Sequence, residues 1–355
     1  MVTEEEIRNA LRGVMDPEIG RSIVELGMVR EIQVDGNEVA VTLALTTMAC
    51  PLKSRLAGDI EAAILAINGN LAVNVKLAEM TAEERTKAFG PAQTQPMVSE
   101  AFNDVKHIIA VLSGKGGVGK SSMAALLAVA LRRQGQQVGV LDADITGPSI
   151  PHMFGLSKMP KPSPLGLVPP VSKKGIKVMS INLLLTDESE PVIWRGPLIT
   201  GIIRQFWGEV LWDKLDTLVI DLPPGTSDAT LTVMGSIPLS GVVLVTSPQD
   251  LAGMVVRKAA GMARIMEVPI IGLIENMSYI ECPDCGHRIE VFGPSHAEET
   301  AQTMGVPLLG RVPLDPELAR SCDQGKVESY PGKAFEPIAA AVSLLVPDVK
   351  CTPKA

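Results

Sequence analysis

From Val105 onward, short apolar runs alternate with longer stretches in which apolar positions recur at helical spacing. The runs carry Val, Ile and Leu on consecutive positions, which is typical of strands buried on both faces of a parallel sheet. The pattern therefore predicts an α/β fold with helices on both faces of the sheet and ligands at the carboxyl ends of the strands. The expected strands are HIIAVLS at 107–113, QVGVLDAD at 137–144, IKVMSIN at 176–182, DTLVIDLPPG at 216–225, GVVLVTSP at 241–248, PIIGLIENM at 269–277 and PLLGRVP at 307–313.

The beginning of the chain has a different pattern. Apolar and polar residues alternate on each side of the turn signal Asp35-Gly36-Asn37, which predicts a β-hairpin. The expected elements are a helix at 4–15, strands at 28–34 and 38–45, a helix at 51–67 and a strand at 70–80. Together they predict a small α+β domain.

The chain is therefore expected to contain two domains. The small domain covers residues 1–80, and a parallel-sheet nucleotide-binding domain covers residues 105–355. Residues 81–104 are polar, contain two prolines and show no sustained periodicity, so we interpret them as a linker.

One segment, SGKGGVGKSS, carries the strongest chemical signal, because Gly114 to Ser121 fit the pattern GxxxxGK[ST] between an expected strand and an expected helix. Glycines let successive backbone N–H groups form an anion nest at a helix N-terminus. Lys120 is then placed to reach the β- and γ-phosphates of ATP, and the Ser121 hydroxyl to bind Mg²⁺. The alternative is a glycine-rich turn that binds nothing. The expected nucleotide-binding residues of this loop are Gly114, Lys115, Gly116, Gly117, Val118, Gly119, Lys120, Ser121 and Ser122.

Aspartates at strand ends complete the expected nucleotide site. Asp221 ends an apolar run and begins DLPPGTSD, the position of a carboxylate that holds Mg²⁺ through water. Gly225 follows where the chain could approach a γ-phosphate, so this loop is a candidate switch. Asp142 and Asp144 end the strand that follows the P-loop helix. The alternative for each aspartate is a turn or a helix cap.

Composition narrows the possible partners. The chain has 355 residues, of which 46% are apolar and 20% charged, with a net charge of -8. A negative charge gives no attraction to DNA or anionic lipid, and an aromatic content of 3% leaves few stacking platforms for single strands. The amino terminus lacks a signal-peptide pattern, and no apolar segment reaches spanning length. We expect a cytoplasmic protein without a nucleic-acid or membrane partner.

Two of the five cysteines form a close pair. Cys282 and Cys285 stand in ECPDCGH, where two thiolates separated by two residues can hold one metal centre. The sequence has no second CxxC, so a four-thiolate site needs a second subunit or scattered ligands such as Cys322 and His287. A structural zinc knuckle and a thioredoxin-like redox pair are the alternatives.

The P-loop also contains an early lysine, Lys115, in the arrangement KGGxGKS. This arrangement resembles the deviant P-loop of the MinD, ParA and nitrogenase iron-protein group. The resemblance implies a homodimeric ATPase in which Lys115 reaches the nucleotide of the partner subunit. It further implies that Asp144 orients the attacking water, and that Asn276 and the segment from Arg311 contact adenine. Asn276 as an ordinary turn residue is the alternative.

A wider set of motifs resembles the Mrp/ApbC family of iron-sulfur cluster carriers. The set comprises LDADITGPS, WRGP at 194–197, DLPPGTSD and CPDCGH. The resemblance implies a [4Fe-4S] cluster held between two subunits and delivered to apo-proteins. It assigns cluster ligation to Cys282 and Cys285 only, because Cys322 and Cys351 match no ligand pattern. A positioning ATPase of the ParA/MinD type with a zinc knuckle, and an electron donor like the nitrogenase iron protein, are the alternatives.

The amino-terminal segment, with DPEIG, ELGMV and TTMACP, resembles SufT-like iron-sulfur assembly domains. The family often has DLG where this chain has Glu25-Leu26-Gly27. The resemblance implies iron-sulfur assembly proteins as further partners. Cys50 precedes Pro51 at an expected helix start, where the helix dipole favours a thiolate, so a transient metal or persulfide contact and a structural cysteine are both open.

Overall fold

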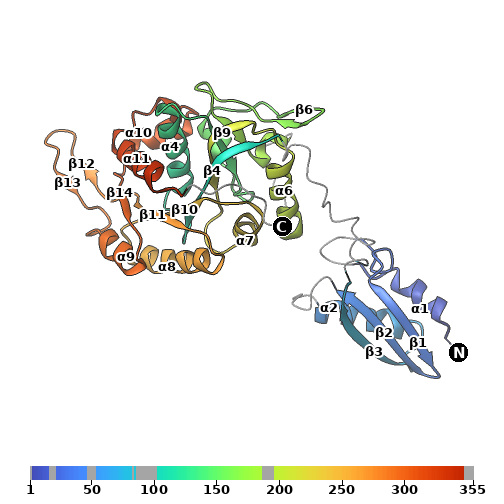
Figure 1. Ribbon diagram of the computed structural model, residues 1–355. Coiled ribbons are helices and arrows are strands. Elements are labelled where there is room, and N and C mark those ends of the chain that lie inside the picture. Colours follow the sequence, from blue (N-terminus) through green and yellow to red (C-terminus); the bar gives the residue numbers. More distant parts are fainter. Residues whose placement is uncertain are drawn as a thin grey trace. The chain divides into compact units, whose positions relative to one another are not determined.

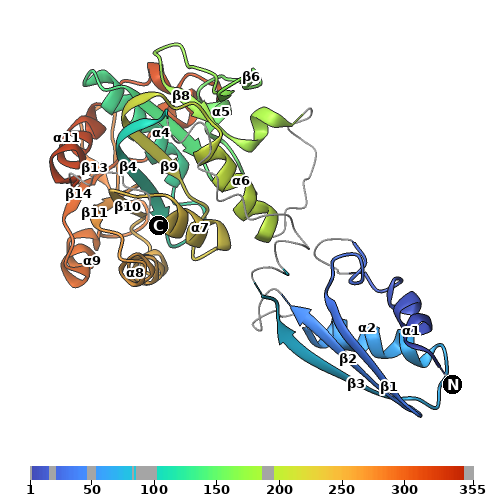
Figure 2. The same cartoon turned by 45° about the vertical axis from the view of Figure 1, so that its right-hand side comes forward.

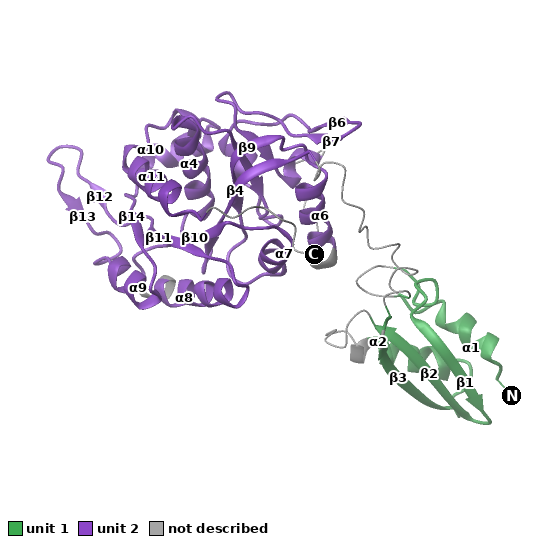
Figure 3. Ribbon diagram, in the orientation of Figure 1, with its two compact units in different colours: residues 1–95 green, residues 96–355 purple. Residues whose placement is uncertain are grey.

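The computed structural model describes residues 2–15, 21–45, 53–81, 84, 102–185 and 196–347. The chain divides into two compact units, residues 1–95 and 96–355, which Figure 3 shows in different colours. None of the described helices is long and apolar enough to cross a membrane.

Unit 1 is a three-stranded sheet covered by two helices (Figure 2). The expected hairpin is present, because β1 and β2 pair antiparallel around the turn at Gly36, and β3 then pairs parallel to β2. On β2, the buried side chains of Val39, Val41 and Leu43 alternate with more exposed ones and belong to one core with Ile7 of α1. The bounds are α1 Glu4–Leu11, β1 Val29–Asp35, β2 Glu38–Leu45, α2 Lys53–Leu65 and β3 Ala72–Glu79.

Two local sequence features explain the backbone conformation in this unit: a capping box at the start of α1 and the glycine of the ELG motif. A capping box begins α1, in which Thr3 and Glu6 each accept a hydrogen bond from the other's backbone N–H, at 3.3 and 2.9 Å. In the ELG motif, Gly27 has φ 66°, a conformation that glycine adopts at little cost. DPEIG, TTMACP and Cys50 lie outside the described residues.

Unit 2 contains a seven-stranded sheet of order β14-β11-β10-β4-β9-β5-β8. All neighbouring strands pair parallel, and the seven strands are the seven expected apolar runs. The predicted α/β fold with a parallel sheet, preceded by a small α+β domain, is therefore confirmed. The bounds are β4 Asp104–Ser113, β5 Val138–Asp142, β8 Lys177–Met179, β9 Lys214–Asp221, β10 Gly241–Thr246, β11 Ile270–Glu275 and β14 Leu308–Arg311.

Helices cover both faces of this sheet (Figure 1). Alternate residues of β4 point to opposite faces: Ile109 and Val111 pack in the core beneath α4 and α11, and Ile108 and Ala110 in the core beneath α6, α7 and α8. The carboxyl-terminal helix packs on the first of these cores. The bounds are α4 Lys120–Arg133, α5 Ile150–Met153, α6 Gly196–Gly208, α7 Asp228–Ser236, α8 Asp250–Ile265, α9 Ala297–Met304, α10 Pro316–Asp323 and α11 Glu336–Leu345.

Two small hairpins stand apart from the main sheet. One pairs β6 Lys161–Ser163 with β7 Gly166–Val168, and the other pairs β12 Ile280–Glu281 with β13 Arg288–Ile289. The second hairpin extends from the body of the unit near β14 (Figure 1). It carries the two cysteines of the CPDCGH motif between its strands.

Candidate nucleotide and cluster site

The P-loop connects the end of β4 to the start of α4. Gly119 stands at the N-cap of α4 with φ 78°, and Gly117 has φ 81°, both in the left-handed region that glycine adopts readily. This backbone directs N–H groups toward the helix N-terminus, where an anion is stabilised. The structure therefore has the strand, loop and helix that the sequence motif predicted.

Close packing fixes the two ends of the loop. A β-carbon on Gly114 would overlap the backbone of Val255 and Val256 in α8. At the other end, a β-carbon on Gly119 would overlap the side-chain amide of Asn276. Only glycine therefore fits at these two positions while α8 and Asn276 stay in place.

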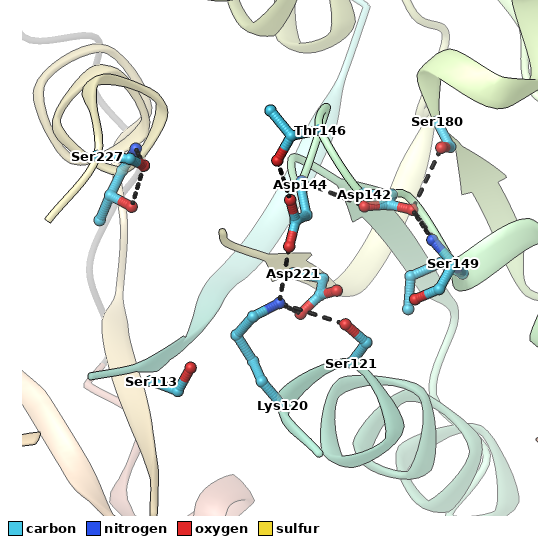
Figure 4. A network of polar contacts seen from close by, with 12 residues as sticks. Ser113, Lys120, Ser121, Asp142, Asp144, Thr146, Ser149, Ser180, Asp221 and Ser227 are labelled. Atoms are coloured by element: carbon cyan, nitrogen blue, oxygen red, sulfur yellow. Dashed lines mark hydrogen bonds and ion pairs between the residues drawn. The ribbon is translucent and has the colours of Figure 1, made fainter. Parts of the chain in front are cut away.

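The two lysines of the loop have different environments. Lys120 is buried, and its Nζ lies 2.6 Å from Asp221 Oδ1, 3.8 Å from Asp144 Oδ2 and 3.3 Å from Ser121 Oγ (Figure 4). Lys115 is exposed, and its Nζ donates to Gln249 Oε1 at 3.4 Å. Lys120 thus faces the carboxylates of its own chain, whereas Lys115 lies on the surface.

Asp221 is fully buried at the end of β9. Burial raises its pKa, and the charge of Lys120 opposes this shift. Its Oδ2 atom is buried and has no hydrogen-bond partner among the described residues. A buried acceptor without a partner fits the expected role of a carboxylate that holds a Mg²⁺-bound water.

Asp142 and Asp221 are register partners on the adjacent strands β5 and β9. Asp142 Oδ2 accepts from the backbone N–H of Ser149 at 3.1 Å and of Ile150 at 3.2 Å, and from Ser180 Oγ at 3.2 Å. Burial first, and the charge of Asp221 second, raise the pKa of Asp142 to about 8. Asp142 is therefore tied into the loop that leads to α5.

Asp144 lies between this loop and Lys120. Its backbone N–H donates to Asp142 Oδ1 at 3.2 Å, and its Oδ1 accepts from Thr146 Oγ1 at 3.1 Å (Figure 4). Its other oxygen is the one that faces Lys120. The fold thus brings Lys120, Asp144 and Asp221 together, as expected from the sequence.

The loop after β9 runs beside the start of the P-loop. The backbone N–H of Gly225 donates to the Ser113 carbonyl at 2.8 Å, and Gly225 has φ 78°. Pro224 lies 3.9 Å from the position that a β-carbon on Gly116 would take. The candidate switch is therefore adjacent to the phosphate-binding loop.

Asn276 directly follows β11 and is buried. Its Nδ2 donates to the Val118 carbonyl of the P-loop at 2.9 Å. The segment after β14 lies beside it, because Val312 donates to the Glu275 carbonyl at 2.8 Å and accepts from the Ser278 N–H at 2.9 Å. Asn276 and the Arg311 segment are therefore neighbours.

The cysteine pair forms a compact turn in the β12–β13 hairpin. Cys282 N–H donates to the His287 carbonyl, and Gly286 N–H donates to the Cys282 carbonyl, both at 2.9 Å. The backbone N–H groups of Cys285 and then Asp284 lower the pKa of the Cys282 thiol. Cys282 is half-buried and Cys285 is exposed, so both are accessible and one is prepared for the thiolate form that binds metal.

The other candidate ligands lie elsewhere. Cys322 is buried in the core beneath α4. Burial raises the pKa of its thiol, and a hydrogen bond with the Ser122 side chain opposes this shift. Among the described residues, no three His, Cys, Asp or Glu side chains gather in a geometry that could hold a metal ion. Cys322 and His287 therefore do not complete a metal site with the cysteine pair in this chain. Trp194, Arg195 and Cys351 lie outside the described residues.

Two polar residues at this edge of the sheet were not singled out from the sequence. Gln249, which bonds Lys115, and Glu275 line an open cavity of about 310 Å³ between α8 and α9. Glu275 ends β11, and Gln249 comes shortly after β10 ends at Thr246, so their positions near strand ends were the available signal.

This fold and site define a P-loop NTPase: a parallel sheet, a glycine loop at a helix N-terminus and a buried lysine beside strand-end aspartates. The model of the NUBPL iron-transfer P-loop NTPase family matches residues 104–346, and that of an iron-sulfur cluster assembly protein matches residues 4–77. The chain belongs to the iron-transfer P-loop NTPase family. The resemblance to iron-sulfur carriers and the expectation of an ATPase are thereby confirmed.

Relatives and solved structures agree with this assignment. The chain is 42% identical to an iron-sulfur cluster carrier protein of Synechocystis sp., over 97% of this chain and 98% of the relative. It is 48% identical to the iron-sulfur cluster carrier protein of Methanocaldococcus jannaschii, over 66% of this chain and 81% of the relative. A nucleotide-binding protein of Archaeoglobus fulgidus, solved in complex with ADP, has 43% identity and a TM-score of 0.61 over 72% of this chain and 98% of its own.

Proposed function

We propose that this ATPase is a homodimeric carrier that holds a [4Fe-4S] cluster between two subunits and transfers it to apo-proteins in the cytoplasm. The observation that carries the proposal is the CPxCG turn, which offers two thiols and gains no third ligand from the described residues. A two-fold dimer supplies two thiolates from each chain and completes a four-thiolate site.

The surroundings of the cysteine pair support a site that another chain covers. Ile289, Val291 and Phe292 follow the turn and are 51, 49 and 39% exposed. Apolar side chains gathered at an exposed site are typical of a protein interface. The amino-terminal match to an iron-sulfur assembly domain supports assembly proteins and apo-protein recipients as further partners.

In the proposed nucleotide site, Lys120 neutralises the β- and γ-phosphates of ATP, and Ser121 and Asp221 hold Mg²⁺, Asp221 through water. The P-loop glycines with Val118 and Ser122 surround the phosphates, and Asn276 is placed to contact adenine beside the loop. Phosphoryl transfer depends on positioning and charge stabilisation.

Two residues are proposed to act on the transferred phosphate. Asp144 orients the attacking water, a role that the position of its Oδ2 atom, 3.8 Å from Lys120 Nζ, supports. Lys115 reaches the nucleotide of the partner subunit, a role that its surface position beside Gln249 supports.

Anaerobic reconstitution with iron and sulfide tests the carrier. We expect about four irons per dimer and transfer of the cluster to an apo-acceptor. Cys282→Ala and Cys285→Ala should each lose the cluster and keep ATP binding, whereas the matched variant Cys351→Ala should keep both. A full cluster in either of the first two variants would contradict the ligand assignment, and tightly bound zinc that iron does not replace would favour a structural knuckle.

A further inference from the structure

Glu275 is a buried charged residue that the nucleotide site does not use. It ends β11, and only 1% of its surface is exposed. A buried carboxylate is costly unless it is paired and hydrogen-bonded, so its partners show what it holds in place.

Those partners come from both ends of one segment, the cysteine hairpin, which we define as residues 276–295. Ser278, before β12, donates a short hydrogen bond to Glu275 Oε2, and Ser295, after β13, donates to the same oxygen at 2.6 Å. Arg311 at the end of β14 adds an ion pair, with Nε 3.5 Å from Oε2. One carboxylate oxygen therefore joins the start and the end of the hairpin.

Arg311 extends this connection to the outer part of the hairpin. Its Nη2 lies 3.2 Å from Glu290 Oε1, and its guanidinium lies 5.8 Å from the centre of the Tyr279 ring. Arg288 lies 4.3 Å from the centre of the same ring. The side chains at the base thus form a continuous set of contacts around Glu275.

Further contacts hold the start of the hairpin: Tyr279 is buried, its carbonyl accepts from the Leu314 N–H at 2.8 Å, and the Ser278 N–H donates to the Val312 carbonyl at 2.9 Å. The two strands of the hairpin have two residues each, and isolated two-stranded ribbons are at best marginally stable in water. None of residues 276–295 belongs to the described hydrophobic cores. Its position therefore depends on the polar contacts at its base.

We propose that Glu275 is the positioning residue of the cysteine pair: its carboxylate fastens both ends of the hairpin and so sets the placement of Cys282 and Cys285. This inference rests on the proposed function in so far as these cysteines hold the cluster. Glu275 itself does not ligate it.

Mobility of the hairpin in cluster-free protein is the direct test. In Glu275→Ala, hydrogen exchange of residues 278–295 should accelerate by about tenfold, because hydrogen bonds to a charged acceptor are lost. Glu275→Gln, which keeps one acceptor oxygen, should give a smaller acceleration. Ser295→Ala, which removes one partner and leaves the carboxylate, provides a milder variant if Glu275→Ala does not fold.

Glu281→Gln is the matched control, because Glu281 lies on the same hairpin and pairs with Arg288 at 3.3 Å in an exposed position. Its hydrogen exchange should match that of the wild type. Reconstituted Glu275→Ala should also release its cluster to a chelator about tenfold faster than the wild type.

The two proposals fail separately. Wild-type exchange rates in folded Glu275→Ala and Ser295→Ala would overturn the positioning role, even if the wild type binds a cluster. Faster exchange in these variants, together with a wild type that binds no cluster, would support the positioning role and overturn the carrier function.

Discussion

Lys120 and Asp221 form a buried ion pair, with 2.6 Å between Nζ and Oδ1 and side chains that are 7 and 0% exposed. The pair joins the first turn of α4 to the end of β9. Loss of one partner leaves the other charge buried and unpaired, which typically costs about 3–5 kcal/mol. Lys120 therefore contributes to stability as well as to phosphate binding, and a variant must separate the two effects.

The first prediction separates them with two variants. Lys120→Met should abolish ATP binding and hydrolysis and lower the free energy of unfolding by about 3–5 kcal/mol. The double variant Lys120→Met/Asp221→Asn, which removes both charges, should recover much of that stability but not ATP binding. Urea denaturation and calorimetric titration with Mg-ATP measure the two properties, and unchanged ATP affinity in either variant would refute the role of Lys120.

A second prediction concerns Lys115, which is exposed and whose Nζ makes a long contact, 3.4 Å to Gln249 Oε1. Lys115→Ala should change the free energy of unfolding by less than about 0.5 kcal/mol. Hydrolysis should fall more than ATP binding, because its proposed target is the phosphate of the partner subunit. A variant with wild-type turnover at saturating ATP would argue against action across the dimer.

Third, the P-loop glycines should differ in their tolerance of a methyl group. Gly114→Ala places a β-carbon against the backbone of Val255 and Val256, which cannot move aside as a side chain can. We expect a loss of about 1–3 kcal/mol in stability, typical of overpacking. Gly116→Ala is the control, since the nearest atom to its new β-carbon is 3.9 Å away, on Pro224. Equal melting temperatures of the two variants would contradict the close approach of α8 to the loop.

A fourth prediction follows from the raised pKa of Asp142, about 8 against an ordinary 3.8, caused first by burial and then by Asp221. Above about pH 4 the unfolded chain has released this proton and the folded protein keeps it. Asp142 therefore makes its full contribution to the free energy of unfolding when the pH is below the pKa that it has in the unfolded chain. This contribution declines as the pH rises toward the pKa that it has in the folded protein.

The asparagine side chain of Asp142→Asn cannot ionise. As the pH rises from about 5 to about 9, the free energy of unfolding of the wild type should therefore fall relative to that of the variant. Urea denaturation across this range measures it. Asp216→Asn serves as the control, because Lys106 lowers the pKa of Asp216 and keeps it charged throughout. A difference for Asp142→Asn that does not vary with pH would show that its carboxyl is ionised in the folded protein.

The fifth prediction places the start of the nucleotide-binding domain. Asn103 accepts from the backbone N–H of Trp212 at 2.8 Å and donates to the Val210 carbonyl at 3.0 Å. A fragment that begins at Asn103 should be soluble and bind ATP, whereas one that begins at Val105 should be less stable by about 1–3 kcal/mol, the cost of unsatisfied buried groups. Aggregation of the longer fragment would show that the domain does not fold independently.

The sequence predicted the seven strands because each is a run of apolar residues. It predicted the P-loop because the spacing of its glycines and lysine is the one that a backbone needs to surround a phosphate. It did not predict the order of the strands. That order places β9 beside β5, and so makes Asp142 and Asp221 register partners whose charges interact. Strand order depends on packing between distant segments, which a single sequence does not display.

The contacts of single polar residues are even harder to predict from the sequence than the order of the strands. The contact between Asn276 and Val118 joins positions 158 residues apart, and an asparagine after a strand is equally typical of a simple turn. Glu275 has the same ambiguity, because a carboxylate at a strand end gives no sign of its partners Ser278 and Ser295. Only the fold shows which of several ordinary uses each residue has.

In the cysteine hairpin, the free energy of binding at the proposed metal site is separate from the free energy of folding, whereas in many metal-binding domains the two are the same. In a zinc finger, the free energy of metal binding is the free energy of folding, so the emptied protein unfolds. Here the described cores close without any residue of the hairpin. At the proposed cluster site, affinity can therefore be weak enough for an acceptor to compete, while the protein without a cluster stays folded and can bind another.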